Sequence, residues 1–256
     1  LLPRESRWYQ HLSSLVKGGI FLHIRDYMKY RPRVAELLSE LPDELLDTIL
    51  IRHYKADDII ISRCEHNADT YLILSGVCCS TCNFISGERV WYRRATVDDV
   101  FGVLGMFEQH HSFSATIFAK TNATLAMIPA ATMQQCFARY PRFTLELSQR
   151  ALNRLNFELW RISECNAYPP YAGTITYLIY AYEFYVRTYS PGFQGPVKII
   201  EKRQEIAHYI GITVRTLQRI LPIIREEGLI EIRRESIYID REHYERLKQR
   251  KSEYFH

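Results

Sequence analysis

Two short stretches of helical periodicity meet at a glycine between residues 203 and 221, and this pair constrains the fold more than any other feature of the chain. Each stretch has one apolar face, so the two helices can pack against each other across a turn at Gly211. The apolar positions are Ile206, Tyr209 and Ile210 before the glycine, and Val214, Leu217, Ile220 and Leu221 after it. The pattern predicts a helix-turn-helix, which is typical of DNA-binding proteins; a plain helical hairpin is the alternative.

The second helix carries side chains that suit the edges of DNA bases. Thr213 stands just before it, where a hydroxyl can cap the free amides of a helix start. Arginine can bind guanine through two hydrogen bonds, and glutamine can bind adenine in the same way. We therefore predict base contacts from Arg215, Gln218 and Arg219, which lie away from the apolar face.

A proline interrupts this second helix. Pro222 lacks an amide donor, and its ring clashes with the carbonyl of Gln218 in a regular helix. We expect a kink or an early end there, after the residues that read bases.

A short hairpin is predicted to follow the helix pair. Residues 229–233 and 236–239 have the composition of two strands, joined by a tight turn at Arg234 and Glu235, and Gly228 suits the end of a helix. Arg233 and Arg234 would place positive charge at the hairpin tip, where a DNA phosphate could lie. The sequence thus predicts a winged helix-turn-helix, although paired arginines also occur on turns that bind nothing.

The sequence before this module has two successive patterns, one helical and one strand-like. Residues 1–52 have the pattern of helices, with Pro42 in the first turn of one of them, and residues 53–128 contain short strand-like runs separated by turns. This spacing predicts an antiparallel β-roll or barrel, and an α+β fold for the whole chain. The runs are residues 58–61, 71–74, 77–84, 90–92, 114–118 and 125–128.

A long helix is predicted from Pro141 to about Cys165, and it carries a heptad seam. The seam consists of Leu145, Ser148, Leu152, Leu155, Leu159 and Ile162. Such a seam indicates a two-stranded homodimer, although a core helix packed on one neighbour has similar spacing.

Tyr168-Pro169-Pro170 breaks the helix and marks a hinge, before a further amphipathic helix with Ile175, Leu178, Ile179 and Tyr182. We expect an N-terminal sensor domain (1–140), a dimerisation helix (141–168) and a DNA-binding domain (169–256).

Composition excludes several classes of protein. The chain has 256 residues and a net charge of only +4, so charge alone does not indicate nucleic-acid binding. It contains no run of about 18 apolar residues, and its six cysteines form no spaced disulfide framework, which together predict a cytoplasmic protein without a membrane partner. Phosphate-loop, zinc-protease and nucleophile motifs are missing from the sequence, and the acidic pairs Asp57-Asp58 and Asp98-Asp99 fall at predicted turns. We therefore expect no enzyme activity, no catalytic residue, no cofactor and no metal site.

The order of these parts resembles the Crp/Fnr family of transcription regulators. The resemblance covers residues 37 to 240 and rests on six segments: SGV (75–77), DVFGVLGMF (99–107), SATIFA (114–119), RQEIA (203–207), GITVRTLQRIL (211–221) and EEGLIEI (226–232). It implies a cyclic-nucleotide-binding-like β-roll, a homodimer on double-stranded DNA, and RNA polymerase as a partner. A protein-interaction module that uses the helix pair for protein contact is the alternative.

The resemblance also assigns roles to residues of the DNA-binding domain (169–256), which is called the reader below. Arg203, Gln204 and Thr213 occupy phosphate-contacting positions, and Lys202 adds charge beside them. Arg215 and Arg219 occupy two of three base-reading positions. The third is Val214, where a better-known member has arginine, so the half-site should differ.

The sensor departs from the cyclic-nucleotide members of the family. Val103 replaces the ribose-binding glutamate and Phe113 the phosphate-binding arginine, leaving only Ser114. Glu158 and Leu159 stand where small hydroxyl residues contact adenine. Losing the charged partner of a buried phosphate weakens the binding free energy by several kcal/mol, as an order of magnitude. We therefore expect poor binding of cyclic AMP.

Four alternatives remain for the signal. An apolar pocket could bind a small effector, and its candidate residues are Gly102, Val103, Leu104, Phe113, Ser114, Leu155, Glu158 and Leu159. The same residues could instead form a filled core with no ligand, or the protein could still respond to a cyclic nucleotide. Cys78, Cys79 and Cys82 could form a redox or metal-binding cluster, but inert thiols are the preferred interpretation.

Overall fold

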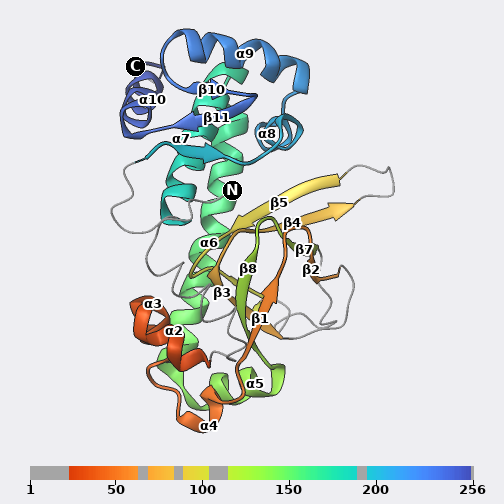
Figure 1. Cartoon of the computed structure of the whole chain (residues 1–256), viewed down its shortest axis with the longest axis vertical. Coiled ribbons are helices and arrows are strands. Elements are labelled where there is room, and N and C mark those ends of the chain that lie inside the picture. The colour runs from red at the N-terminus through yellow and green to blue at the C-terminus, as the bar shows by residue number, and fades with distance from the viewer. Residues whose placement is uncertain (1–22, 63–68, 84–88, 104–114, 189–194, 255–256) are drawn as a thin grey trace. The chain divides into compact units, whose positions relative to one another are not determined.

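The computed structural model describes residues 23–62, 69–83, 89–103, 115–188 and 195–254. The chain divides into two compact units, one with the residues up to Cys82 together with Tyr92–Arg154, and the other with Leu155–His256 together with Asn83–Trp91. Helices and sheets occur in both, as the α+β prediction requires (Figure 1). No helix in the described ranges combines the length and the apolar character that crossing a membrane requires.

The first unit contains two four-stranded sheets, with strand orders β1-β8-β3-β6 and β2-β7-β4-β5, and every registered pair in them is antiparallel. The apolar side chains between the sheets include Ile61, Ile73, Ile117 and Leu125, all buried. The predicted β-roll is therefore confirmed (Figure 1). The strands are β1 (Leu50–Tyr54), β2 (Ile59–Ile61), β3 (Thr70–Ser75), β4 (Cys78–Asn83), β5 (Arg89–Ala95), β6 (Val100–Phe101), β7 (Thr116–Ala119) and β8 (Ala123–Ile128).

Four short helices form a second core against this roll: α2 (Ile24–Tyr30), α3 (Pro32–Leu38), α4 (Asp43–Leu46) and α5 (Ala130–Arg139). Leu37 and Leu38 of α3 pack with Leu72 and Leu74 of β3, and Phe143 joins the same cluster. The prediction of packing helices near the N-terminus is thus confirmed for the described residues from 23 onward.

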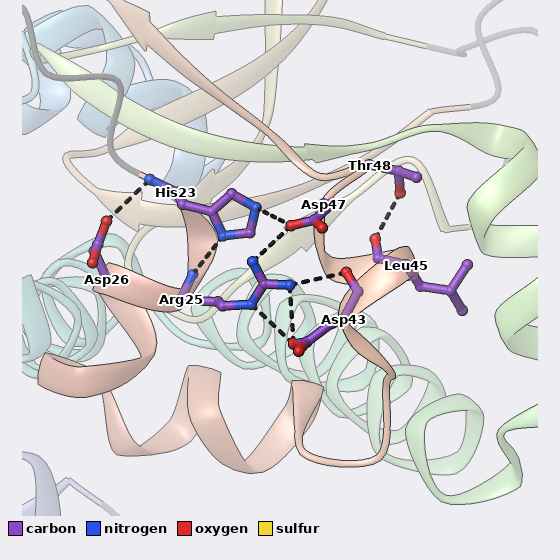
Figure 2. Close-up of polar contacts among 7 residues, drawn as sticks. All are labelled: His23, Arg25, Asp26, Asp43, Leu45, Asp47 and Thr48. Carbon is purple, nitrogen blue, oxygen red and sulfur yellow. Dashed lines mark hydrogen bonds and ion pairs between the residues drawn. The ribbon is translucent and has the colours of Figure 1, made fainter.

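Polar contacts tie α2 to α4 (Figure 2). The Arg25 guanidinium donates to the Asp43 carboxylate at 3.0 Å and to the Asp47 carboxylate at 2.6 Å. His23 caps α2 by accepting from the Arg25 amide at 3.3 Å, and its Nε2 lies 2.9 Å from Asp47. These contacts fix two helices that are too short to be stable alone.

The helical prediction was wrong at the end of the first zone. Residues 50–52 belong to β1, where Leu50 pairs with Met127 and Tyr54 with Ala123 of β8. Pairing with a strand about 75 residues away overrides the local helical pattern, a contact that sequence periodicity cannot register. Pro42 stands at the N-cap of α4, one position before the first turn.

The acidic pairs lie at turns, as predicted. Asp57 and Asp98 have positive φ angles of 71° and 70°. The Asp58 carboxylate accepts from the Lys55 amide at 2.7 Å, and that of Asp99 accepts from the Thr96 amide at 2.8 Å. Both pairs therefore serve turn geometry.

The long helix α6 spans Pro141–Ala167, and α7 begins at Pro170, so the helix break at Tyr168-Pro169 is confirmed. The second unit is built around α7 (Pro170–Thr188). Residues 172–181 are all buried, so the prediction of an amphipathic helix was wrong for this part of α7, which neighbours cover on every side. The elements after it are β9 (Val197–Ile199), α8 (Arg203–Ile210), α9 (Val214–Glu226), β10 (Glu231–Arg233), β11 (Ser236–Ile239) and α10 (Arg241–Glu253).

Candidate nucleic-acid interface

The first helix of the pair, α8, ends in a glycine-dependent motif. Gly211 has a φ of +76°, and the amide of Ile212 donates to the Ala207 carbonyl at 3.0 Å while that of Gly211 donates to His208 at 3.2 Å. These two bonds form a Schellman motif. A side chain at residue 211 would also lie 2.5 Å from Asn166 Oδ1, but this is the end of an exposed side chain that can move aside, so glycine is required here for its φ.

The second helix, α9, presents the predicted faces. Thr213 caps it by accepting from the Thr216 amide at 3.1 Å. The buried side is formed by Leu217, Ile220, Leu221 and Ile224. Arg215, Gln218 and Arg219 are exposed, and Val214 is half-buried. The helix-turn-helix is therefore confirmed, together with the outward direction of the three candidate base-reading side chains.

Pro222 does not end α9, so of the two expected outcomes the early end was wrong, and the kink stays a prediction. The helix continues to Glu226, and Pro222 is exposed. Burial of Leu221 and Ile224 on either side of the proline holds this turn in place despite the missing amide donor.

Replacing Pro222 with alanine is expected to stabilise the second unit. The new amide can donate to the Gln218 carbonyl, which should raise the free energy of unfolding by about 1 kcal/mol and the melting temperature by roughly 2–4 °C. DNA affinity should stay unchanged, because the candidate base-reading residues precede this turn. Thermal unfolding beside Arg225→Ala, an exposed control on α9, checks this; a lower melting temperature for Pro222→Ala would show that the proline itself stabilises the helix.

The hairpin after α9 has the predicted form of a wing. Gly228 (φ +69°) closes α9 with a second Schellman motif, in which its amide donates to Arg225 and that of Leu229 donates to Ile224, at 3.0 and 3.1 Å. Strands β10 and β11 pair with Arg233 opposite Ser236, and β9 adds a third strand that was not predicted. The winged helix-turn-helix is thus confirmed (Figure 1).

The wing tip is a two-residue turn in which both residues are left-handed. Arg234 and Glu235 have φ angles of 44° and 67°. This is the geometry of a type I′ turn, which usually contains asparagine and glycine. Arg203 of α8 supports the turn by donating from Nη2 to the Glu235 carbonyl at 2.9 Å.

The candidate cations differ in what surrounds them. Arg203 is half-buried, and burial lowers the pKa of its guanidinium. Arg233 is exposed but forms an ion pair with Glu231 and lies 5.2 Å from the centre of the Tyr238 ring. The remaining exposed polar candidates have no hydrogen bond or ion pair through their side chains within the described ranges; they are Lys202, Gln204, Arg215, Gln218, Arg219 and Arg234. These side chains are available to phosphates and base edges.

The predicted seam of α6 is an exposed apolar row. Leu145, Leu152 and Leu159 are 60%, 58% and 58% exposed, and Leu155 and Ile162 are 40% and 38% exposed. Ser148, the remaining seam residue, is half-exposed. The opposite face of the helix is buried and includes Phe143, Leu147, Arg154, Glu158, Arg161 and Cys165. The single chain thus leaves a stripe of leucines in water along this helix.

The effector-pocket candidates fall in different surroundings. Leu104, Phe113 and Ser114 lie outside the described residues. Gly102 has a φ of +90°, and Val103 is buried in the core that contains Leu72. Glu158 is buried in an ion pair with Arg161, whereas Leu155 and Leu159 are exposed on the seam.

The described cysteines of the candidate cluster, Cys78 and Cys79, are buried. Cys78 is fully buried, and burial raises its pKa to about 12. Cys79 is also buried, and the side chain of Cys82 lies outside those described. A thiol that stays protonated at neutral pH is a poor nucleophile and metal ligand. Within the described residues, no group of three or more histidine, cysteine or acidic side chains could hold a metal ion.

Comparison with known proteins agrees with this architecture. Residues 51–140 match the cyclic nucleotide-binding domain, and residues 176–249 match the Crp-like helix-turn-helix domain. The cAMP-activated global transcriptional regulator CRP of Salmonella typhimurium is 26% identical over 191 residues, which are 74% of this chain and 89% of that protein. The regulator of the same name from Haemophilus influenzae is 24% identical and covers 77% of this chain and 88% of its own length.

Solved structures show the same fold. FixK2 from Bradyrhizobium japonicum has a TM-score of 0.62 at 17% identity, covering 78% of this chain and 96% of its own. The c-di-GMP responsive global regulator CLP from Xanthomonas campestris has a TM-score of 0.61 at 17% identity, covering 82% and 98%. With its two matched domains in this order, the chain belongs to the Crp/Fnr family of DNA-binding transcription regulators, which are not enzymes.

Proposed function

We propose that the protein is a homodimeric, sequence-specific transcription regulator in which each subunit reads one half-site. Residues 1–140 would form the sensor, 141–168 the dimerisation helix and 169–256 the DNA-binding domain. The observation that carries this proposal is an outward-facing row of exposed polar side chains on α9, beside a wing with an exposed Arg234. RNA polymerase would be a partner, as for family members that regulate initiation, and the site of action would be the cytoplasm.

Contacts divide into two kinds in this proposal. Arg215, Gln218 and Arg219 enter the major groove and read bases, with Val214 at the start of the same helix. Phosphates are held by the helix starts and the wing, through Lys202, Arg203, Gln204, Thr213, Arg233 and Arg234.

A gel shift with promoter DNA tests the proposal. A regulator of this type should bind with a dissociation constant of roughly 10⁻⁸ M or lower, prefer its operator to random DNA by about 10³-fold or more, and lose affinity steeply with salt. A protein-interaction module would bind every fragment equally weakly.

The exposed leucine row of α6 supports dimerisation. Burying a leucine side chain stabilises by about 1.5–3 kcal/mol relative to leaving it in water. A second copy of α6 supplies a matching row at the same heptad spacing, with Leu145, Leu152 and Leu159 on one line and Ser148, Leu155 and Ile162 on the other. The homodimer would thereby bring two readers onto one duplex.

Cyclic AMP is not the proposed signal, although the two CRP relatives are named as cAMP-activated. Val103 packs in the core where the family's ribose-binding glutamate would be, and Glu158 is occupied by Arg161. The signal would be another small effector in the sensor, or none.

Titration calorimetry with cyclic AMP is therefore expected to show no binding at micromolar concentration. The physical reason is that the replaced charged side chains leave a buried phosphate without a partner. Binding at micromolar or lower concentration would contradict this and favour a cyclic-nucleotide-responsive regulator. The same titration with Val103→Glu, which restores only one family residue, serves as a control and should also show no binding.

A further inference from the structure

The buried face of α6 carries charge in its last three turns. Arg161 is one of the largest fully buried side chains of the protein and is only 1% exposed. Its guanidinium donates from Nε to Glu158 Oε2 at 2.8 Å, and its Nη2 lies 2.7 Å from the same oxygen. Earlier in the helix, the same buried face carries the apolar residues Phe143 and Leu147; here it carries a charged pair.

Arg161 reaches from α6 to the first helix of the reader. Its guanidinium carbon lies 4.9 Å from the centre of the Tyr209 ring on α8. The Tyr209 ring stacks on Tyr177 of α7, with centroids 5.9 Å apart and planes 28° from parallel. The Arg161 guanidinium therefore contacts Glu158 of its own helix and Tyr209 of α8, and Tyr209 in turn stacks on α7.

A buried pair of this kind is a weak source of stability, because removing two charges from water costs about as much as their attraction returns. An apolar residue at 161 would fill the same space at less cost. What a guanidinium adds is direction: it is planar, its donors have fixed angles, and its attraction to an aromatic face depends on orientation. These properties suit a residue that sets an angle between helices.

The end of α6 approaches the reader closely at two further points. A side chain at Gly173 of α7 would lie 2.6 Å from the Cys165 carbonyl, and one at Gly211 would lie 2.5 Å from Asn166 Oδ1. On another side, Glu164 accepts from the Tyr180 hydroxyl and from Lys251 Nζ, the latter at 2.7 Å. The end of α6 is thus held to the reader by the close backbone approach of Cys165 to Gly173 and by the hydrogen bonds of Glu164, as well as by Arg161.

We propose that Arg161, held by Glu158 and stacked on Tyr209, is a positioning residue that fixes the direction of the reader on the dimerisation helix and thereby the half-site spacing that the dimer accepts. The inference rests on the proposed homodimer. The seam residues Leu159 and Ile162 flank Arg161 on the same two turns of α6, so contact with the partner and contact with the reader are rigidly related.

The experiment starts from DNA selected out of a random library by the wild-type protein. The selected operator is then remade with one or two base pairs inserted at its centre, and as a single half-site. Each inserted pair separates the half-sites and rotates one of them by roughly a tenth of a turn, so wild-type affinity should fall by about tenfold or more.

Two matched pairs of variants are compared on these DNAs. Tyr209→Leu removes the ring, and Arg161→Lys keeps the charge but loses the planar group; both should discriminate between spacings by less than about threefold while binding a single half-site like wild type. Tyr209→Phe, which keeps the ring, and Arg241→Lys, an exposed change on α10, should keep the wild-type spacing preference.

The outcomes separate the two proposals. Wild-type spacing preference in both Tyr209→Leu and Arg161→Lys would overturn the positioning role, as would equal losses on the single half-site and the full operator, which are expected of a merely structural residue. Should either variant not fold, Glu158→Gln gives the same test, since it removes the charge with little change in shape. Failure of the wild-type protein to select any paired half-sites would instead overturn the proposed function, and this inference with it.

Discussion

A protein carrying Leu152→Glu and Leu159→Glu is expected to be a monomer that binds its operator at least about 100-fold more weakly than wild type. Both leucines are 58% exposed in the single chain, so the changes cost the fold little. In the proposed dimer they would place four carboxylates in one apolar seam, at a cost of several kcal/mol, on the order of the affinity lost. Analytical ultracentrifugation and a binding titration on the same sample check the two effects together.

The control for this result is Asn153→Glu, which adds one carboxylate beside Leu152 but off the seam. Asn153 is exposed and should leave both dimerisation and operator binding within about twofold of wild type. A dimer that survives the double leucine change would show that α6 does not carry the subunit contact.

Removal of the Arg219 side chain is expected to relax specificity at one base pair. The side chain is exposed on α9 with no partner within the described part of the chain, so Arg219→Ala should lose about 1–3 kcal/mol of discrimination there and little elsewhere. Arg203→Ala should weaken operator and random DNA by similar factors, because it removes a proposed phosphate contact and the donor that supports the Glu235 carbonyl at the wing tip. Binding to a set of single-base operator variants measures both.

Arg241→Ala is the matched control, because Arg241 is exposed on α10 and outside the proposed interface. It should bind every DNA like wild type. Equal losses on specific and random DNA for both Arg219→Ala and Arg203→Ala would remove the division between base-reading and phosphate-holding residues.

The reader could be predicted because its signals are local. Gly211, Thr213 and Gly228 act on backbone groups within five residues of themselves, and each occupies the capping position that its residue type favours. The outward direction of Arg215 and Arg219 follows from helical periodicity alone. Their exposure could therefore be predicted without knowing which distant residues contact the helix.

Elements that depend on distant partners were missed. Strand β1 exists because β8 pairs with it, and β9 exists because β11 does. Helices α5 and α10 were also not predicted; α10 has few apolar positions, with Leu247 its buried anchor, so its periodicity is weak. Helix α7 was expected to have a polar face, but its surroundings bury residues 172–181 throughout.

The same distinction holds within the candidate site. The bond from Arg203 to the Glu235 carbonyl joins residues 32 positions apart, and nothing in the sequence indicates it. Arg161 was missed for a similar reason: a charged residue normally lies on the solvated side of a helix, whereas Arg161 is buried beside Glu158 and Tyr209. A buried arginine leaves one signal in sequence, its position on the face that also carries Phe143, Leu147 and Cys165.

The mass of the complex on selected operator DNA tests the central claim most directly. Native mass spectrometry should find two chains on each duplex with two half-sites whose centres lie about one helical turn apart, and the affinity of that complex should fall steeply between about 50 and 200 mM salt. One chain per duplex, or two chains that bind any sequence equally, would contradict the account.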